Sequence, residues 1–163
     1  MENGALEIRE REEQNPLKIL VVDNDEGIGS LAKDIFEDQG HKVTSFTSKE
    51  EALNTLREQK QGVTFDLIIT NRGYAARDNG EMDGFEFARV IKEEQLGDPY
   101  IVMLSRSAEQ TMEENPEKLK EWGIDKVIKK VGRKEEPSMR QQLQDLAKTV
   151  IKMRIQSDYP HRT

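Results

Sequence analysis

The sequence predicts an α/β fold, a doubly wound parallel sheet of five strands with helices on both faces. Three observations lead to this prediction. Short apolar runs alternate with segments of helical periodicity five times along the chain, without internal repeats. The central run, Leu67-Ile68-Ile69, is continuous and mostly β-branched, as expected for a strand buried on both faces. Capping residues and glycines separate the segments, so the strands and helices have defined ends.

The predicted elements follow one another with short connections. Strands are predicted at 17–22, 41–46, 65–71, 100–104 and 126–128. Helices are predicted at 28–40, 48–56, 84–95, 116–123 and 137–156. Ser48 followed by Glu51 has capping-box spacing, and Asn115-Pro116 is typical of an N-cap with proline at the first helical position. The charged stretch 105–115 is predicted to be irregular and partly helical.

Composition excludes several classes of function. The chain of 163 residues has a formal net charge of −7, which argues against nonspecific nucleic-acid binding. It has no cysteine, so disulfides, thiolate catalysis and zinc–thiolate sites are excluded. His41 and His161 are far apart in sequence and are expected at the surface. No apolar stretch approaches the ~20 residues that span a bilayer, and the acidic N-terminus has no signal core, so a cytoplasmic location is expected.

One domain is expected between two polar ends. Residues 1–15 are rich in glutamate and arginine and are predicted to form a disordered or helical arm. Residues 16–156 form the predicted domain, and residues 157–163 form a polar tail. Within the domain, the polar loop from Asn71 to Asp83 is expected to be the most mobile internal segment and to cover the crevice at the strand ends.

The carboxyl ends of the strands define the candidate site, because open α/β sheets bind ligands in the crevice outside those ends. There, Asp23 follows the first strand and Asn71 ends the third. The wider motifs are Ile19-Leu20-Val21-Val22-Asp23, Asp66-Leu67-Ile68-Ile69, Met82-Asp83-Gly84, Ile101-Val102-Met103-Leu104-Ser105, and Gly123-Ile124-Asp125 leading to Lys130. In this order and at these spacings they resemble a receiver domain of two-component signalling, from about Leu17 to Ile155.

The resemblance implies a flavodoxin-like (βα)5 fold with sheet order 2-1-3-4-5. Such receivers accept a phosphoryl group on a carboxylate at the end of the third strand. Two adjacent acids after the first strand help to hold Mg²⁺, and a lysine and a Ser or Thr hydroxyl stabilise the phosphoryl group.

The sequence departs from that pattern in its acids. Asn71 occupies the phosphoacceptor position, and Asn24 replaces the second acid beside Asp23. An amide oxygen is a poor nucleophile, so no acyl phosphate can form on Asn71. Mg²⁺ is expected to bind weakly or not at all, with Asp23 and Asp25 as weak candidate ligands, and no other cofactor is expected. Asp23 and Lys130 are then expected to balance each other's charge, with the amide as a neutral spacer.

The remaining family positions match in part. Ser105 supplies the expected hydroxyl. Lys130 matches the pocket lysine, with Lys129 as an alternative register. Val127 stands where receivers carry an aromatic switch residue in the last strand, and Val131 replaces the expected proline. These combined departures favour a natural atypical receiver over an engineered Asp-to-Asn change at position 71.

Several candidate residues also fit ordinary structural roles. Asp25 and Glu26 fit acids that cap a helix N-terminus. Trp122 fits a core anchor of its helix. Three arginines surround the crevice mouth and either bind an anion or are solvated: Arg72, Arg77 and Arg106.

The predicted function is that of a single-domain pseudo-receiver that signals through phosphorylation-independent protein binding and is not an enzyme. Its expected partner is a signalling protein, such as a histidine kinase or an effector; no DNA-binding domain follows and no membrane contact is expected. The resemblance implies a partner face, or homodimer contact, made by the fourth helix, fifth strand and fifth helix. Candidate residues on that face are Trp122, Lys126, Ile128 and the outward side of 140–155. Leu143 belongs to the predicted apolar stripe of the last helix, and it is a position to substitute on that face only if it is exposed.

Two other functions remain open. One is a phosphorylatable phosphorelay receiver that uses another carboxylate, for which Asp66 and Asp83 lack the end-of-strand position. The other is a flavodoxin-like ligand or nucleotide binder, for which Gly27 and Gly29 after the first strand are only a weak signal.

Overall fold

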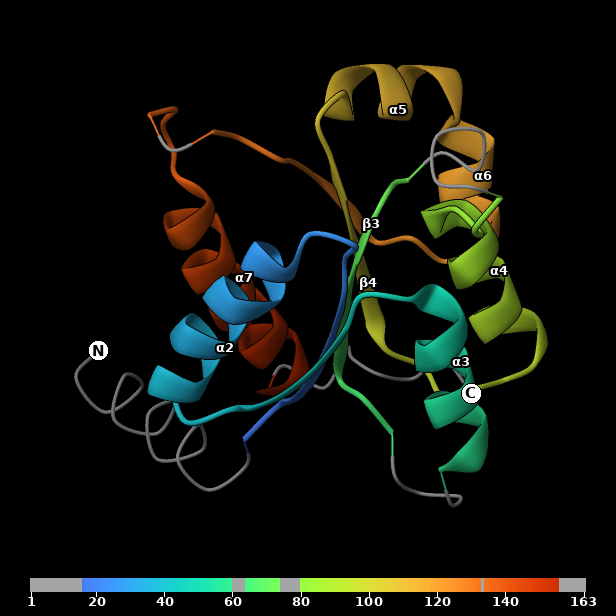
Figure 1. The fold of residues 1–163 in the computed structure, drawn as a ribbon, viewed down its shortest axis with the longest axis horizontal. Coiled ribbons are helices and arrows are strands. Elements are labelled where there is room, and N and C mark those ends of the chain that lie inside the picture. Colours follow the sequence, from blue (N-terminus) through green and yellow to red (C-terminus); the bar gives the residue numbers. More distant parts are fainter. Residues whose placement is uncertain (1–15, 60–63, 74–79, 133, 156–163) are drawn as a thin grey trace.

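A five-stranded parallel sheet organises the chain in the computed structural model, which describes residues 16–59, 64–73, 80–132 and 134–155 (Figure 1). The strands are β1 (Lys18–Val22), β2 (Lys42–Phe46), β3 (Leu67–Asn71), β4 (Tyr100–Ser105) and β5 (Lys126–Lys129). Their order across the sheet is β2-β1-β3-β4-β5, and every neighbouring pair is parallel. The predicted doubly wound, flavodoxin-like fold is therefore confirmed.

Helices cover both faces of the sheet. Within the described ranges they are α2 (Glu26–Asp38), α3 (Lys49–Glu58), α4 (Gly84–Glu93), α5 (Ala108–Glu114), α6 (Pro116–Glu121) and α7 (Met139–Ile155). Helices α2 and α7 lie on one face, and α3, α4 and α6 lie on the other (Figure 1). The stretch predicted to be irregular and only partly helical contains all of α5, because Ala108 and Thr111 bury one side of a short helix whose other residues are exposed.

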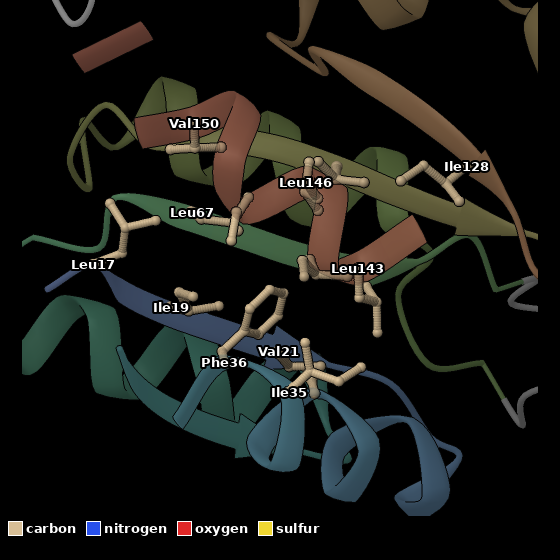
Figure 2. Close-up of a cluster of buried hydrophobic side chains, with 14 of the residues drawn as sticks. Leu17, Ile19, Val21, Ile35, Phe36, Leu67, Ile128, Leu143, Leu146 and Val150 are labelled. Atoms are coloured by element: carbon tan, nitrogen blue, oxygen red, sulfur yellow. The ribbon is translucent and has the colours of Figure 1, made fainter. Parts of the chain in front are cut away.

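The core divides into two clusters because successive strand residues point to opposite faces of the sheet. Ile19 and Leu67 face α2 and α7, where they pack with Phe36 and Leu146 (Figure 2). Leu20 and Ile68 lie in register and face the other way, into the cluster formed with α3 and α4. The residues of β3 are all buried, so the central strand is fixed in position along its full length.

Three residues expected at the surface, or considered as surface candidates, are buried. His41 is 5% exposed, and its Nδ1 accepts a hydrogen bond from the Leu17 amide at 3.0 Å, because the chain entering β1 lies beside the start of β2. Ile128 and Leu143 belong to the first core cluster, because β5 presents Ile128 to α7 and α7 presents Leu143 to the sheet. Ile128 is therefore removed from the candidate partner face, and Leu143 keeps its predicted place in the apolar stripe of the last helix.

Some predicted features lie outside the described residues. These are the arm at 1–15, the tail at 157–163 with His161, and residues 74–79 of the long loop with Arg77. The predicted mobility of that loop therefore stays a prediction. Among the described helices, none has both the length and the hydropathy needed to cross a bilayer.

The junction between β3 and α4 brings two backbone segments close together. The Gly84 amide donates a hydrogen bond to the Arg72 carbonyl at 2.6 Å, and the Asp83 side chain caps α4 by accepting from the Glu86 amide at 2.9 Å. A Cβ on Gly84 would lie 2.5 Å from the Asn71 carbonyl oxygen. The carboxyl end of β3 therefore stays in place only if position 84 has no side chain.

We expect Gly84→Ala to lower the free energy of unfolding by roughly 2 kcal/mol, because the added carbon forces the end of β3 or the start of α4 to move. Denaturant unfolding followed by circular dichroism measures the change. Gly132→Ala is the matched control, since a Cβ there meets nothing within 4 Å. Equal unfolding midpoints for the two variants would contradict this account of the junction.

Candidate functional site

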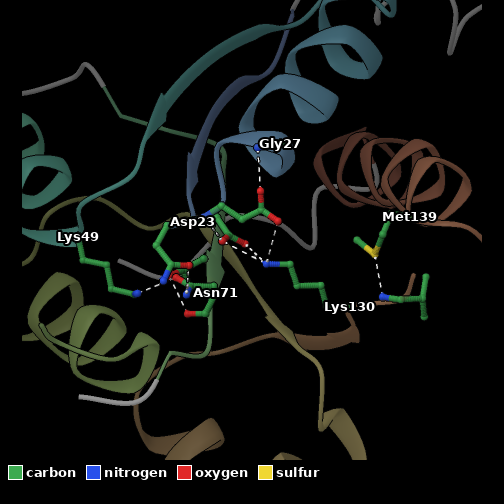
Figure 3. Close-up of polar contacts among 10 residues, drawn as sticks. Asp23, Gly27, Lys49, Asn71, Lys130 and Met139 are labelled. Carbon is green, nitrogen blue, oxygen red and sulfur yellow. Dashed lines mark hydrogen bonds and ion pairs between the residues drawn. The ribbon is translucent and has the colours of Figure 1, made fainter. Parts of the chain in front are cut away.

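A polar crevice lies at the carboxyl ends of the strands, between the loops that leave β1, β3, β4 and β5 (Figure 3). Its volume is about 460 Å³. The lining residues are Asn24, Asn71, Arg72, Gly73, Leu104, Ser105, Arg106, Ser107, Gln110 and Lys130. Parallel strands all end at one edge of the sheet, which is why residues far apart in sequence meet there.

Asp23 and Lys130 form an ion pair beside this crevice. The Lys130 ammonium lies 3.0 Å from Asp23 Oδ2 and 3.2 Å from Oδ1, and the Asp23 side chain is 1% exposed. Asp23 Oδ1 also accepts a hydrogen bond from the Asp25 amide at 2.9 Å. Lys130, and not its exposed neighbour Lys129, therefore reaches the carboxylate at the end of β1, so the expected charge balance is observed.

Asn71 ends β3 inside the crevice and is 7% exposed. Its Nδ2 lies 3.4 Å from Asn24 Oδ1, so the two amides that stand at the family's acid positions contact each other. Its Oδ1 accepts a 2.6 Å hydrogen bond from the ammonium of Lys49. The predicted neutral spacer is therefore held by a lysine that the sequence analysis did not select.

Lys49 is the main site residue missed by sequence reasoning. It is the first residue of α3, directly after the Ser48 N-cap, and it is buried. A lysine is rarely fully buried, and the first turn of a helix favours acidic side chains. A single basic residue directly after an N-cap that follows a predicted strand was the available signal.

Asp25 and Glu26 fit their structural reading. Asp25 is the N-cap of α2, and its Oδ1 accepts a hydrogen bond from the Gly27 amide at 2.9 Å. Its Oδ2 lies 3.9 Å from the Lys130 ammonium, on an exposed side chain at the rim. Glu26 is exposed in the first turn of α2. The loop after β1 is thus a helix cap rather than a glycine-rich phosphate cradle.

The Ser105 hydroxyl is buried at the end of β4 and already has protein partners. Its Oγ lies 3.1 Å from Thr111 Oγ1 and accepts a hydrogen bond from the Ser107 amide at 3.1 Å. The Lys130 amide donates to the Ser105 carbonyl at 2.8 Å, which ties the end of β4 to the end of β5. Ser105 is therefore fixed between α5 and the crevice.

The arginines around the crevice have different environments. The Arg72 guanidinium lies 4.7 Å from the Phe85 ring centre, and Nη1 donates to the Gly73 carbonyl at 2.8 Å and lies 3.4 Å from Asp83. Arg72 is thus not an ordinary solvated arginine. Arg106 is exposed at the rim and lines the crevice.

The described residues do not fit a divalent cation in this crevice. None of the described histidines and acids forms a cluster of three that would hold a metal ion. Asp23 is ion-paired, Asp25 caps a helix, and positions 24 and 71 offer neutral amides. Mg²⁺ prefers several hard anionic oxygens as ligands. The Asp23 carboxylate, already paired with Lys130, is therefore a poor ligand set by itself.

Most of this chain matches one known protein family. The response regulator receiver domain model matches residues 19–144, most of the chain. This chain belongs to the response regulator receiver family. Receivers are the signal-accepting domains of two-component systems, so membership indicates a role in two-component signalling.

Sequence relatives of this receiver are distant. The response regulator SaeR of Staphylococcus aureus is 25% identical over 91 residues, which cover 56% of this chain and 36% of SaeR. The alignment therefore spans well under half of that relative.

Solved structures share the fold of this receiver. The receiver domain of Francisella response regulator 1452 is 23% identical, with a TM-score of 0.63, and covers 86% of this chain and 99% of its own. CheY4 of Vibrio cholerae is 22% identical, with a TM-score of 0.65 and coverages of 83% and 99%. The BeF3-activated DrrB receiver domain is 21% identical, with a TM-score of 0.62 and coverages of 85% and 99%.

We expect Asp23→Asn to lower the free energy of unfolding of this receiver by roughly 3 kcal/mol, because it leaves the Lys130 ammonium without its buried counter-charge. The amide oxygen keeps the acceptor for the Asp25 amide, so the substitution isolates the charge. Denaturant unfolding measures the loss, and adding Lys130→Met should recover part of it.

The control for this prediction is Glu94→Gln, which breaks the exposed ion pair with Arg57. Exposed pairs contribute little, so this variant should unfold close to the unsubstituted protein. If Asp23→Asn lowers the free energy of unfolding no more than Glu94→Gln does, the ion pair between Asp23 and Lys130 does not stabilise the fold as proposed.

Proposed function

We propose that this chain is a pseudo-receiver, which binds a signalling partner without being phosphorylated. The observation that carries this proposal is the amide of Asn71 at the end of β3, where members of the family carry the phosphoacceptor carboxylate. An acyl phosphate forms when an ionised carboxylate oxygen attacks phosphorus. The amide of Asn71 has no ionised oxygen, so this side chain cannot accept a phosphoryl group. In this proposal the chain is a binding module, without enzymatic activity or a resident cofactor.

The geometry of the other carboxylates argues against a substitute acceptor. Asp66 directly precedes β3, and its Oδ2 accepts a hydrogen bond from the Lys18 amide at 2.8 Å. This contact lies at the amino-terminal ends of the strands, away from the crevice. Asp83 caps α4 and lies 3.4 Å from Arg72. Asp23 is ion-paired with Lys130. Each of these acids already has a structural role, which supports the proposal over a phosphorelay receiver with a shifted acceptor.

The binding surface of such a receiver would stay in one state. A phosphoryl group ordinarily draws the Ser or Thr of the fourth strand inward, and an aromatic side chain in the last strand follows. Here Ser105 is held by Thr111 and the Ser107 amide, and Val127 has no ring to move. A ligand shifts an equilibrium only when two states exist and bind it differently. In this proposal the second state is missing, and binding to the partner is constitutive.

The proposed partner face is the surface formed by α6, the edge strand β5 and α7. The half-buried Trp122 at the C-cap of α6 packs edge-on to Phe85 of α4, with ring centres 5.9 Å apart, which fits the core-anchor role more than a place on this face. Lys126 opens β5 and is exposed. The exposed side of α7 carries Arg140, Gln141, Asp145, Lys148 and Lys152. The proposed occupant is a signalling protein such as a histidine kinase or an effector, and a homodimer is the other occupant to test.

The test of phosphorylation is direct. The purified protein, incubated with acetyl phosphate and Mg²⁺, should show no added phosphoryl group by intact-protein mass spectrometry. Restoring Asn71→Asp together with Asn24→Asp supplies a matched variant with the family's acids. A phosphorylated Asp in the unsubstituted protein would overturn the proposal.

The partner face predicts a second result. Lys126→Glu should weaken binding to a co-purified signalling partner, or self-association, by roughly tenfold, because it reverses a charge on the proposed face. Lys42→Glu is the matched control, because Lys42 is the exposed first residue of the other edge strand, β2. Quantitative binding measurements should give the same affinities with and without acetyl phosphate. Equal effects of the two substitutions would place the partner elsewhere.

A further inference from the structure

Lys49 is a buried cation at the end of the crevice where Asn24 and Asn71 meet. Its ammonium donates a hydrogen bond to Asn71 Oδ1 at 2.6 Å, and the residue is 9% exposed (Figure 3). The side chain reaches the crevice from the first position of α3. It therefore contacts the side-chain oxygen of the very residue that stands at the family's phosphoacceptor position.

This location is unfavourable for an ammonium group unless crevice oxygens compensate it. The N-terminus of a helix carries a partial positive charge, which repels a cation. Burial also removes the hydration of the ammonium. The next two residues, Glu50 and Glu51, are exposed, so solvent is accessible to the same turn. The inward position of Lys49 is therefore held by interactions inside the crevice, of which the short contact with Asn71 is one.

We propose that the Lys49 ammonium is an internal cation that takes the place of a divalent ion in this receiver. This inference rests on the proposed function, because it explains how the crevice keeps one arrangement without Mg²⁺. Asn71 Oδ1 accepts from Lys49, Asn71 Nδ2 faces Asn24 Oδ1, and Asp23 is neutralised by Lys130. Two lysines thus supply the positive charge that the oxygens of this crevice require.

The proposal has a consequence for any attempt to restore the family's acids. A carboxylate at position 71 would lie against the Lys49 ammonium and form an ion pair with it. That pair would compete with a metal ion for the same oxygen, and the fixed positive charge would repel the ion. Restoring the two acids would therefore be insufficient for tight Mg²⁺ binding while Lys49 remains.

The experiment compares Mg²⁺ binding in three variants of the full chain by isothermal titration calorimetry. The first carries Asn24→Asp and Asn71→Asp. The second variant adds Lys49→Met to these two substitutions. The third is the control and instead adds Lys42→Met, which removes one positive charge from the exposed first residue of β2, at the amino-terminal end of that strand. We expect Lys49→Met to tighten Mg²⁺ binding by roughly tenfold or more, because it removes the repulsion, and Lys42→Met to leave it within about twofold. Equal affinities in all three variants would overturn the proposal.

A second measurement covers the case in which Lys49→Met does not fold. The side-chain amide resonances of Asn71 are recorded by NMR in the unsubstituted protein and in Lys49→Gln, which keeps a polar side chain without the charge. A clear shift of these resonances is expected, because their hydrogen-bond donor has changed. Unchanged resonances would overturn the proposal. Phosphoryl uptake by the unsubstituted protein would instead overturn the proposed function. The calorimetric and NMR results therefore test the role of Lys49, and phosphoryl uptake tests the proposed function separately.

Discussion

The ion pair between Asp23 and Lys130 links the end of the first strand to the residue after the last strand, across 107 positions of sequence. It sits where five parallel strands bring their carboxyl ends to one edge of the sheet. Because the Asp23 side chain is almost fully buried, its charge must be compensated within the protein. The Lys130 ammonium supplies that compensation, and the neutral amides of Asn24 and Asn71 lie beside the pair.

Neutral amides change what such a crevice does. In the family, several acids crowded together need a cation and repel each other when it is absent. Here Asn24 and Asn71 contact each other, and Lys49 donates to the amide oxygen that replaces an acid oxygen. The Ser105 hydroxyl is held by Thr111. These contacts hold the crevice side chains against one another, which supports the proposal of a receiver whose partner surface is always presented.

The sequence predicted the fold well because its signals are local and repeated. The apolar run Leu67-Ile68-Ile69 indicated a central strand, and the Ser48 cap and the Asn115-Pro116 pair indicated helix starts; the structure contains each of them. The meeting of Asp23 with Lys130 was implied by the resemblance to receivers, which matched Lys130 to the pocket lysine. The sheet order also came from that resemblance, whereas the strands and helices themselves followed from local patterns.

The features that sequence reasoning missed depend on the direction of single side chains. Lys49 was missed because a lysine at the start of a helix is usually solvated, and its inward rotamer depends on the Asn71 oxygen across the crevice. His41 was expected at the surface, but the strand register places it against the Leu17 amide. Ile128 was a candidate surface residue, and the packing of α7 on β5 buries it. No periodicity in the sequence determines these contacts.

The central claim is that no phosphoryl-type ligand at the crevice changes the surface of α6, β5 and α7. The most direct measurement is an amide ¹H–¹⁵N NMR spectrum of the unsubstituted protein in Mg²⁺, with and without beryllium fluoride, the activator named for the DrrB receiver domain. The account predicts that the resonances of Ser105, Val127 and the residues of α6 and α7 stay where they are. A saturable shift that begins at Asn71 and extends through β5 to those helices would contradict it.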